Sequence, residues 1–455
     1  MIGSLDSTRR EATVVGAGVA GLLAAYALDR AGYEVTLVEE RGRAGGLIQT
    51  VETEYGIAER AAHSLLVTPA VAELCRDLGV ELTDMRRDSR SRFILRDGKL
   101  RKFPLSVGET AGALSRAAFA RAGNHADALD LEAWGRRHLG GAAVEYLLTP
   151  FVRGIYGVEP SGLGVAAAFP ELAVAEGRTL LGTMMRKALK GSSTNGSAKT
   201  SFSEEQKSFS GDAHATTNGN GRAVKSERKR MVAPLRGMGD LVSRLEGRLE
   251  ERLGERFVRG VRVSEITEAP NVVITAPAYA AAELLDAQAP TLSDRLREVQ
   301  YTPIVTATAF VSRDAFTRPV SGVGVLAPPS ERRACLGILF NSSAFEGRVR
   351  DELSHASFTV LFGGASQPQW VTAPGEEIER AVKQELSELL GIRGGLLRLV
   401  VTHWCRAIPQ YSTRLPRVWQ SARETWCARP GRILFGNYTG QVSLRGMIET
   451  ALSFS

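Results

Sequence analysis

The sequence is poor in the residues that build disulfide frameworks and metal centres. Its 455 residues include only 4 cysteines and 6 histidines. The cysteines form no Cys-x-x-Cys pair, which argues against a disulfide scaffold and a zinc ribbon. The histidines show neither His-x-His nor His-Glu-x-x-His spacing, so we expect no metal site. A reduced, cytoplasmic setting is the simplest interpretation, and the length is ample for a large core.

Long hydrophobic runs are also lacking. The longest candidate, residues 14–28, is interrupted by Gly16, Gly18 and Gly21. The first eleven residues are polar and have no apolar core of a signal peptide. We therefore expect no transmembrane segment, whereas peripheral contact with a membrane surface is compatible with the sequence.

Positive charge is in modest excess, but it is not concentrated. The formal net charge is +7, and residues 191–230 carry seven Lys/Arg against four Asp/Glu. No basic helix is interleaved with aromatic residues, so we expect no nucleic-acid partner. Residues 191–230 consist mostly of Ser, Gly, Asn, Thr and Lys, a composition typical of a disordered linker.

The first fifty residues predict a β-α-β unit with a glycine-rich turn. A short strand over 12–15 precedes Gly-Ala-Gly-Val-Ala-Gly at 16–21, a helix follows to Arg30, and a second strand covers 34–38. Glu39 lies 23 residues after Gly16, near the offset of the acid that binds ribose hydroxyls. In such a turn the three glycines permit the tight bend, the approach of a pyrophosphate and close packing of the helix. This unit predicts a dinucleotide site.

The next residues favour FAD over NAD. The stretch from Val35 to Gly46 (VTLVEERGRAGG) resembles the glutathione-reductase-like flavoproteins of the amine-oxidase branch. The resemblance implies that Arg43, Gly45 and Gly46 continue the cradle toward phosphate and ribityl groups. A second matching stretch, residues 430–444 near the C-terminus, resembles the strand, glycine turn and helix start that reach the flavin in that branch.

Within this branch, the chain resembles the protoporphyrinogen and coproporphyrinogen oxidases of haem synthesis, along nearly its whole length outside 191–230. The motifs that carry the resemblance are GIAER at 56–60 with His63-Ser64, SRFI at 91–94, PFVRGIY at 150–156, APAY at 276–279, GVGVLAP at 322–328, LGILF at 336–340, and Trp404 with AIPQY at 407–411.

The resemblance implies the site residues by position. Arg92 falls on the arginine proposed to hold a substrate propionate, and a fixed guanidinium suits a carboxylate. The positions that sandwich the tetrapyrrole fall on Leu326, Leu339 and Leu361, although ordinary sheet core explains these leucines equally well. Val263 falls on the valine that contacts adenine. The expected cofactor-binding set is Gly16, Ala17, Gly18, Val19, Ala20, Gly21, Glu39, Glu40, Arg43, Gly45, Gly46, His63, Val263, Trp404, Gly436, Asn437, Val442 and Leu444.

The expected fold is α/β with a helical part: a Rossmann-like FAD-binding domain of the glutathione-reductase type, a mixed-sheet substrate domain and a helical insertion. We expect the FAD domain to join residues 1–88, 231–288 and 428–455. Residues 89–190 form the insertion, including a hairpin at 93–103 and a break around Pro150 to Leu163, and residues 289–427 form the substrate domain. A strand is predicted over 257–266.

The expected activity is oxidation of protoporphyrinogen IX or coproporphyrinogen III by FAD, with dioxygen as acceptor and hydrogen peroxide as product. No His or Glu stands out as a general base, so the catalytic residues are left unassigned. A homodimer is compatible with the resemblance. Two alternatives stay open: a flavin amine oxidase or carotenoid desaturase, and a non-enzymatic flavin- or tetrapyrrole-binding homologue.

Three departures from the family pattern keep the second alternative open. Ala61-Ala62 replace the usual Gly-Pro, only four residues separate Ile266 from Asn271 where a β-hairpin is usual, and the last helix begins Leu-Arg-Gly-Met at 444–447.

Overall fold

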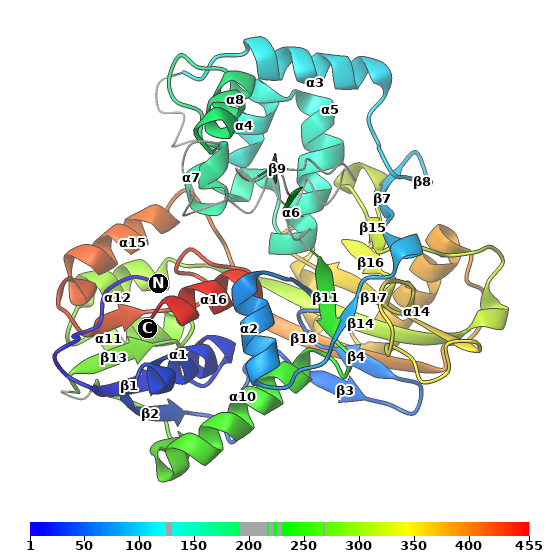
Figure 1. Ribbon diagram of the computed structural model, residues 1–455. Helices are drawn as coiled ribbons and strands as arrows, with labels where there is room; N and C mark the ends of the chain where they lie inside the picture. Colours follow the sequence, from blue (N-terminus) through cyan, green and yellow to red (C-terminus); the bar gives the residue numbers. More distant parts are fainter. Residues whose placement is uncertain (124–129, 192–215, 218–222, 225–229, 267–268, 455) are drawn as a thin grey trace.

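The computed structural model describes residues 1–123, 130–191, 216–217, 223–224, 230–266 and 269–454. Most of the predicted linker, 191–230, lies outside the described residues. Its described part includes a short antiparallel pair, β9 (Thr216–Thr217) and β10 (Ala223–Val224). Three regions make up the rest: a parallel sheet near both termini, a larger mixed sheet, and a helical layer above both (Figure 1).

The parallel sheet has five strands in the order β12-β2-β1-β13-β19. It draws strands from three distant parts of the sequence: β1 (Glu11–Val15), β2 (Glu34–Glu39), β12 (Phe257–Arg259), β13 (Asn271–Ile274) and β19 (Arg432–Leu434). Helices cover both faces, as the near-continuous apolar strands require. One face packs on α1 (Val19–Arg30), α10 (Met238–Leu253) and α16 (Leu444–Ala451), and the other on α11 (Ala278–Leu285), α12 (Pro290–Arg297) and α15 (Leu415–Glu424).

Between the two large sheets lie smaller elements. A hairpin joins β3 (Thr50–Glu52) to β4 (Ile57–Glu59), and a three-stranded sheet has the order β5-β11-β6, with β5 (Leu65–Leu66), β6 (Leu82–Asp84) and β11 (Met231–Pro234). Helix α2 (Pro69–Asp77) runs beside α16 (Figure 1).

The larger sheet has seven strands in the order β18-β14-β17-β16-β15-β7-β8. The strands are β7 (Arg92–Arg96), β8 (Lys99–Arg101), β14 (Tyr301–Ser312), β15 (Gly324–Leu326), β16 (Gly337–Leu339), β17 (His355–Gly363) and β18 (Arg398–Pro409). One face is a closed apolar core against α14 (Gly375–Glu385) and the π-helical turn Leu386–Leu390. The sheet contains the predicted hairpin, because β7 pairs with both β8 and β15.

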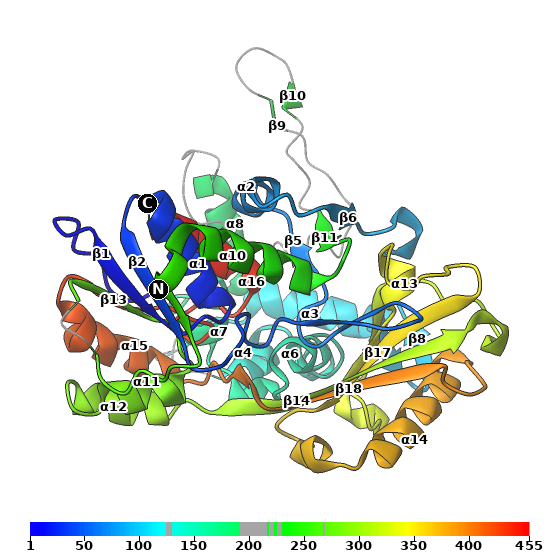
Figure 2. The same cartoon turned by 90° about the horizontal axis from the view of Figure 1, so that it is seen from below.

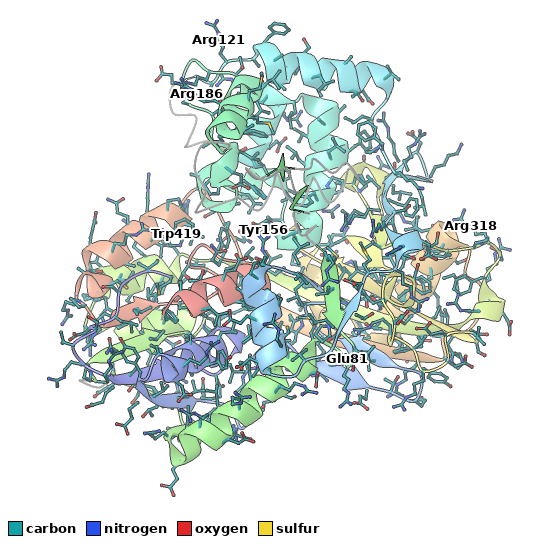
Figure 3. The ribbon with its side chains drawn as sticks, in the orientation of Figure 1. Glu81, Arg121, Tyr156, Arg186, Arg318 and Trp419 are labelled. Carbon is teal, nitrogen blue, oxygen red and sulfur yellow. The ribbon has the colours of Figure 1, made fainter. Side chains whose placement is uncertain are left out.

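The helical layer stands over the junction of the two sheets (Figures 1 and 2). It contains α3 (Val107–Phe119), α4 (Leu131–His138), α5 (Gly141–Ala143), the π-helical turn Val144–Leu148, α6 (Thr149–Tyr156), α7 (Val165–Ala168) and α8 (Leu180–Gly191). A short helix, α13 (Asn341–Ala344), precedes β17. Figure 3 shows Arg121 and Arg186 at the outer end of the layer and Tyr156 at its base.

Two predicted boundaries were wrong. The break expected at Pro150 begins only after Tyr156. Helical residues run without interruption from Gly141 to Tyr156, and Pro150 directly follows the π-helical turn Val144–Leu148, where the regular α-helical bonding is already interrupted. The strand expected over 257–266 ends at Arg259. Its neighbour β2 ends opposite, at Glu39, and Gly260 turns away with a φ of +71°. The described residues between Arg259 and Asn271 contain no further strand.

Candidate functional site

The glycine turn lies at the carboxyl edge of the parallel sheet, where open α/β sheets bind their ligands. Gly16 has a φ of +101° and donates its N–H to Val38 O (2.7 Å). Gly21 packs so closely that a Cβ there would lie 1.8 Å from Gly16 O. A Cβ on Gly18, the N-cap residue of α1, would meet no atom within 4 Å. The turn is therefore tight beneath Gly21 and open above Gly18, as a pyrophosphate cradle requires.

Glu39 occupies the end of β2, directly beside this turn. Its Oε2 accepts the N–H of Ala17 (2.6 Å), and its Oε1 accepts the N–H of Arg41 (3.0 Å). These bonds fix the carboxylate next to the glycines, where it can accept ribose hydroxyls. The adjacent Glu40 is exposed, and its carboxylate lies 3.7 Å from the guanidinium of Arg262.

The second glycine pair closes over the first. Gly45 donates its N–H to Ala17 O (2.8 Å), and a Cβ on Gly46 would lie 3.2 Å from the Cα of Gly18. Arg43 bonds the carbonyl of Gly46 (3.2 Å). Partial burial, together with the positive charges of Arg41 and Arg60, lowers the pKa of Arg43 below its usual value. Clustered arginines beside uncapped helix amides suit a phosphate.

A chain of hydrogen bonds leads from this cradle to the seven-stranded sheet. Gln49 donates to Gly46 O (3.0 Å), and Arg60 pairs with Gln49 through both backbone (2.9 Å) and side chain (2.9 Å). Two groups of the sheet, Trp404 Nε1 (2.8 Å) and Thr306 Oγ1 (3.2 Å), then donate to Arg60 O. The predicted cofactor residue Trp404 is thus tied to the segment that follows the glycine cradle.

The four predicted substrate residues share one face of the seven-stranded sheet. In the strand register Leu326 and Leu361 lie opposite Gly337, and Arg92 and Leu339 lie opposite Gly324. Because alternate residues point to the same side, this face also carries Thr306 and Trp404. The three leucines are only half-buried, whereas the opposite face is closed core. Arg92 lies at the start of β7, with its guanidinium 3.8 Å from Met231 Sδ.

Helix α6 covers part of this face. Its Gly154 allows close approach, because a Cβ there would lie 2.8 Å from Leu326 Cδ2. The neighbouring Arg153 is buried and holds the helix down by donating to Ala327 O (3.1 Å) and pairing with Glu159 (3.2 Å). Burial lowers the pKa of Arg153 and raises that of Glu159.

The C-terminal turn is fastened by aromatic side chains. Tyr411 donates its hydroxyl to Asn437 O (2.6 Å), and Trp419 donates to Tyr438 O (2.8 Å). Figure 3 shows Trp419 on α15. Gly436 follows β19 and therefore lies at the same sheet edge as the glycine turn.

Three other predicted cofactor residues, Val442, Leu444 and Val263, are described by their burial and by the segments beside them. Val442 is half-buried against an aliphatic and aromatic core, and Leu444 is buried as the first residue of α16. Val263 follows β12 in a loop whose Val261 N–H donates to Glu39 O (3.1 Å), which brings this segment beside Glu39.

His63 carries a buried, unpartnered nitrogen. Among the described residues nothing hydrogen-bonds its Nε2, and the same holds for Nε of nearby Arg60. Burial, with a smaller contribution from the charge of Arg348, lowers the pKa of His63 to about 4. The imidazole is therefore neutral at physiological pH and can donate or accept a hydrogen bond. A buried polar atom without a partner in the protein can be satisfied by ordered water or by a bound ligand.

The low pKa of His63 predicts a pH-dependent loss of stability. The unfolded chain binds a proton on His63 below about pH 6.5, whereas the folded protein binds it only near pH 4. Stability must therefore fall as the pH drops through this window. Glutamine does not titrate there, so the difference between the wild type and His63→Gln should shift by up to about 3 kcal/mol. Urea unfolding of both proteins between about pH 6.5 and 4 measures this difference in unfolding free energy. A difference that stays constant with pH would contradict a buried, neutral His63 in the folded protein.

Sequence reasoning missed two residues that shape the site. Thr275, at the end of β13, donates its hydroxyl to Val15 O (2.9 Å) and Gly16 O (2.7 Å) and so fixes the glycine turn. Gln49 bridges the cradle to Arg60. Thr275 lies about 260 residues from the turn, and nothing in the local sequence indicates that contact.

Two further structural findings concern the described residues only. Within them no group of three or more His, Cys, Asp or Glu side chains is arranged to hold a metal ion. None of their helices combines the length and the hydrophobicity needed to cross a bilayer.

Comparison with known proteins gives consistent matches. The family described as flavin containing amine oxidoreductase matches residues 19–453. A mitochondrial protoporphyrinogen oxidase of Nicotiana tabacum is 26% identical over 472 residues, which cover 96% of this chain and 92% of the relative. The coproporphyrinogen III oxidase of Bacillus subtilis is 23% identical, covering 90% and 88%. A crystal structure of a candidate protoporphyrinogen oxidase from Exiguobacterium superposes with a TM-score of 0.71 at 19% identity, covering 99% and 98%.

Proposed function

The chain belongs to the family of flavin-containing amine oxidoreductases, and from that premise we propose that it is a porphyrinogen oxidase. FAD is its cofactor, and the cradle around Gly18, with Glu39 and the arginines beside it, fits a dinucleotide. We propose protoporphyrinogen IX or coproporphyrinogen III as the substrate, dioxygen as the acceptor and hydrogen peroxide as the second product. The relatives that match nearly the whole chain act on these two porphyrinogens by name.

The observation that carries the proposal is the shared sheet face. Three half-buried leucines and Arg92 line the side of the sheet that also bonds the carbonyl of Arg60, which the hydrogen-bond chain connects to the dinucleotide cradle. A macrocycle with apolar faces and carboxylate side arms matches an apolar surface that has a cation beside it.

In the proposed mechanism the protein binds and orients more than it reacts. Bound FAD supplies a hydride acceptor. Glu39 and the glycine turns hold the dinucleotide, and Arg92 anchors a substrate carboxylate. Leu326, Leu339 and Leu361 contact the ring and exclude water from it. We assign no proton acceptor.

The role of Arg92 predicts a defect in binding. An Arg92→Met variant loses a charge-assisted hydrogen bond worth about 1.5–3 kcal/mol, so its KM should rise roughly 10- to 100-fold while kcat changes little. Arg90→Met, which alters an exposed arginine two residues earlier, is the matched control. Steady-state kinetics with each porphyrinogen measures both. Equal KM values for the two variants would contradict the proposal that Arg92 binds a substrate carboxylate.

The proposal is tested by assaying the purified yellow protein with protoporphyrinogen IX and with coproporphyrinogen III in air. Porphyrin fluorescence and peroxide are recorded against the same substrates without enzyme. Acceleration of one substrate well above autoxidation supports the proposal and names the substrate. A flavin-loaded protein inert to both would contradict it and would favour an amine substrate or a binding role.

A further inference from the structure

The β3–β4 hairpin meets a loop from a distant part of the sequence, through an isolated bridge between Gly56 and Val349. The segment 346–350, which leads into β17, runs against the tip of the β3–β4 hairpin. Ile57 donates its N–H to Arg348 O (3.2 Å), and Arg350 donates its N–H to Tyr55 O (2.9 Å). Gly56 allows the approach, because a Cβ there would lie 2.3 Å from Arg348 O. The loop that precedes β17 of the seven-stranded sheet is thus joined directly to the hairpin.

The side chain of Arg348 enters the protein at this contact and is almost completely buried. Only 3% of Arg348 and 4% of Glu59 is exposed. The guanidinium donates to Pro234 O (2.5 Å) and Leu235 O (3.1 Å) and pairs with Glu59 Oε1 (3.4 Å).

Glu59 is held by further hydrogen bonds on its own side. It accepts the N–H of Met238, the first residue of α10 (2.7 Å), and the hydroxyl of Thr50 (2.7 Å). The pair therefore links the hairpin, the turn before α10 and the loop before β17 at one buried point.

Burying two charges is costly. The effective penalty is several kcal/mol for each ion, and an apolar pair of similar size is often no less stable. Burial raises the pKa of Glu59 and lowers that of Arg348, each toward its neutral form. A gain in folding stability is therefore a weak explanation for the Glu59–Arg348 pair, and its effect on the position of neighbouring residues is a better one.

The residues whose position the pair affects are those of the segment 59–63. Glu59 directly precedes Arg60, whose carbonyl is held by Trp404 and Thr306 and whose N–H is held by Gln49. The segment is thus fixed from both sides. It carries two of the buried nitrogens that lack a hydrogen-bond partner among the described residues, Arg60 Nε and His63 Nε2.

We propose that Glu59 and Arg348 form a positioning pair, which holds the segment 59–63 in the place where it contacts bound FAD. Neither residue touches the cofactor in this proposal; both act through Arg60 and His63. The inference rests on FAD binding, which family membership shows, and not on the identity of the substrate.

The test uses a double variant that removes both charges together. Glu59→Gln with Arg348→Met leaves no unpaired buried charge, so its melting temperature should stay near that of the wild type. Its FAD dissociation constant should rise about 10-fold, or ~1.4 kcal/mol, and the visible circular dichroism of the bound flavin should change. The control is Glu52→Gln, which alters an exposed ion pair between the same two segments, Arg350 and Glu52 at 3.8 Å. It should leave both readouts unchanged.

Wild-type FAD affinity and wild-type flavin dichroism in a folded double variant would overturn the proposal. If the double variant fails to fold, Arg348→Lys decides the question. It keeps the charge opposite Glu59 but lacks the fork that reaches Pro234 O and Leu235 O together. Altered flavin dichroism in this variant supports the positioning role, and wild-type dichroism with wild-type affinity refutes it.

Discussion

A Gly21→Ala variant is expected to lose its FAD and much of its stability. The added Cβ would lie 1.8 Å from Gly16 O, 2.9 Å from Gly16 C and 2.7 Å from Thr275 Oγ1. Backbone atoms cannot rotate away as a side chain can, so α1 has to separate from β1. Overpacking of this kind costs about 3 kcal/mol or more, which is about 3 °C or more in melting temperature for a chain of this length.

Thermal unfolding and the flavin content of the purified protein measure this effect. Gly247→Ala is the matched control, since this glycine lies in the middle of α10 and a Cβ there would meet no atom within 4 Å. A yellow Gly21→Ala protein with the stability of the control would show that the turn is not packed as described.

A Gly18→Ala variant should separate cofactor binding from folding. Gly18 has a φ of −62°, which any residue adopts, and a Cβ there meets no protein atom within 4 Å. The folded protein therefore tolerates alanine, whereas the methyl group occupies the space that a pyrophosphate needs. Steric conflict of about 1–3 kcal/mol predicts a roughly 10- to 100-fold weaker FAD complex.

FAD titration of the flavin-depleted protein, together with its melting curve, checks the expectation for Gly18. The two glycine variants thus differ in kind, since one should fail in folding and the other in binding only. Unchanged FAD affinity in Gly18→Ala would place the pyrophosphate somewhere else.

Local patterns in the sequence were sufficient for several elements. The β-α-β unit around Gly16 was predicted correctly because strand alternation, glycine spacing and the position of Glu39 are all local signals. The hairpin predicted over 93–103 was also correct, and its turn lies at Asp97 and Gly98. Both residues have positive φ, at +55° and +68°, which a two-residue hairpin turn favours.

Contacts between distant segments could not be predicted in the same way. Thr275 and Arg348 act on residues roughly 260 and 290 positions earlier in the chain. The expected strand over 257–266 had suitable apolar residues, but β2 ends at Glu39 and offers no partner beyond Arg259. The contacts of Thr275 and Arg348 and the end of β12 are set by which strands lie side by side in the folded protein, and the local sequence does not encode that arrangement. The assignments of individual cofactor and substrate residues stay predictions.

The most direct measurement of the central claim is anaerobic mixing of the purified, FAD-loaded protein with each porphyrinogen. If the leucine face and the glycine cradle form one site, electrons pass from porphyrinogen to flavin without oxygen. The visible absorbance of oxidised flavin should then disappear at a rate that saturates with the concentration of at least one porphyrinogen. Porphyrin should appear only after air is admitted, because its formation removes six electrons and each flavin accepts two. Flavin that stays oxidised with both porphyrinogens, in a protein that dithionite reduces normally, would contradict the account.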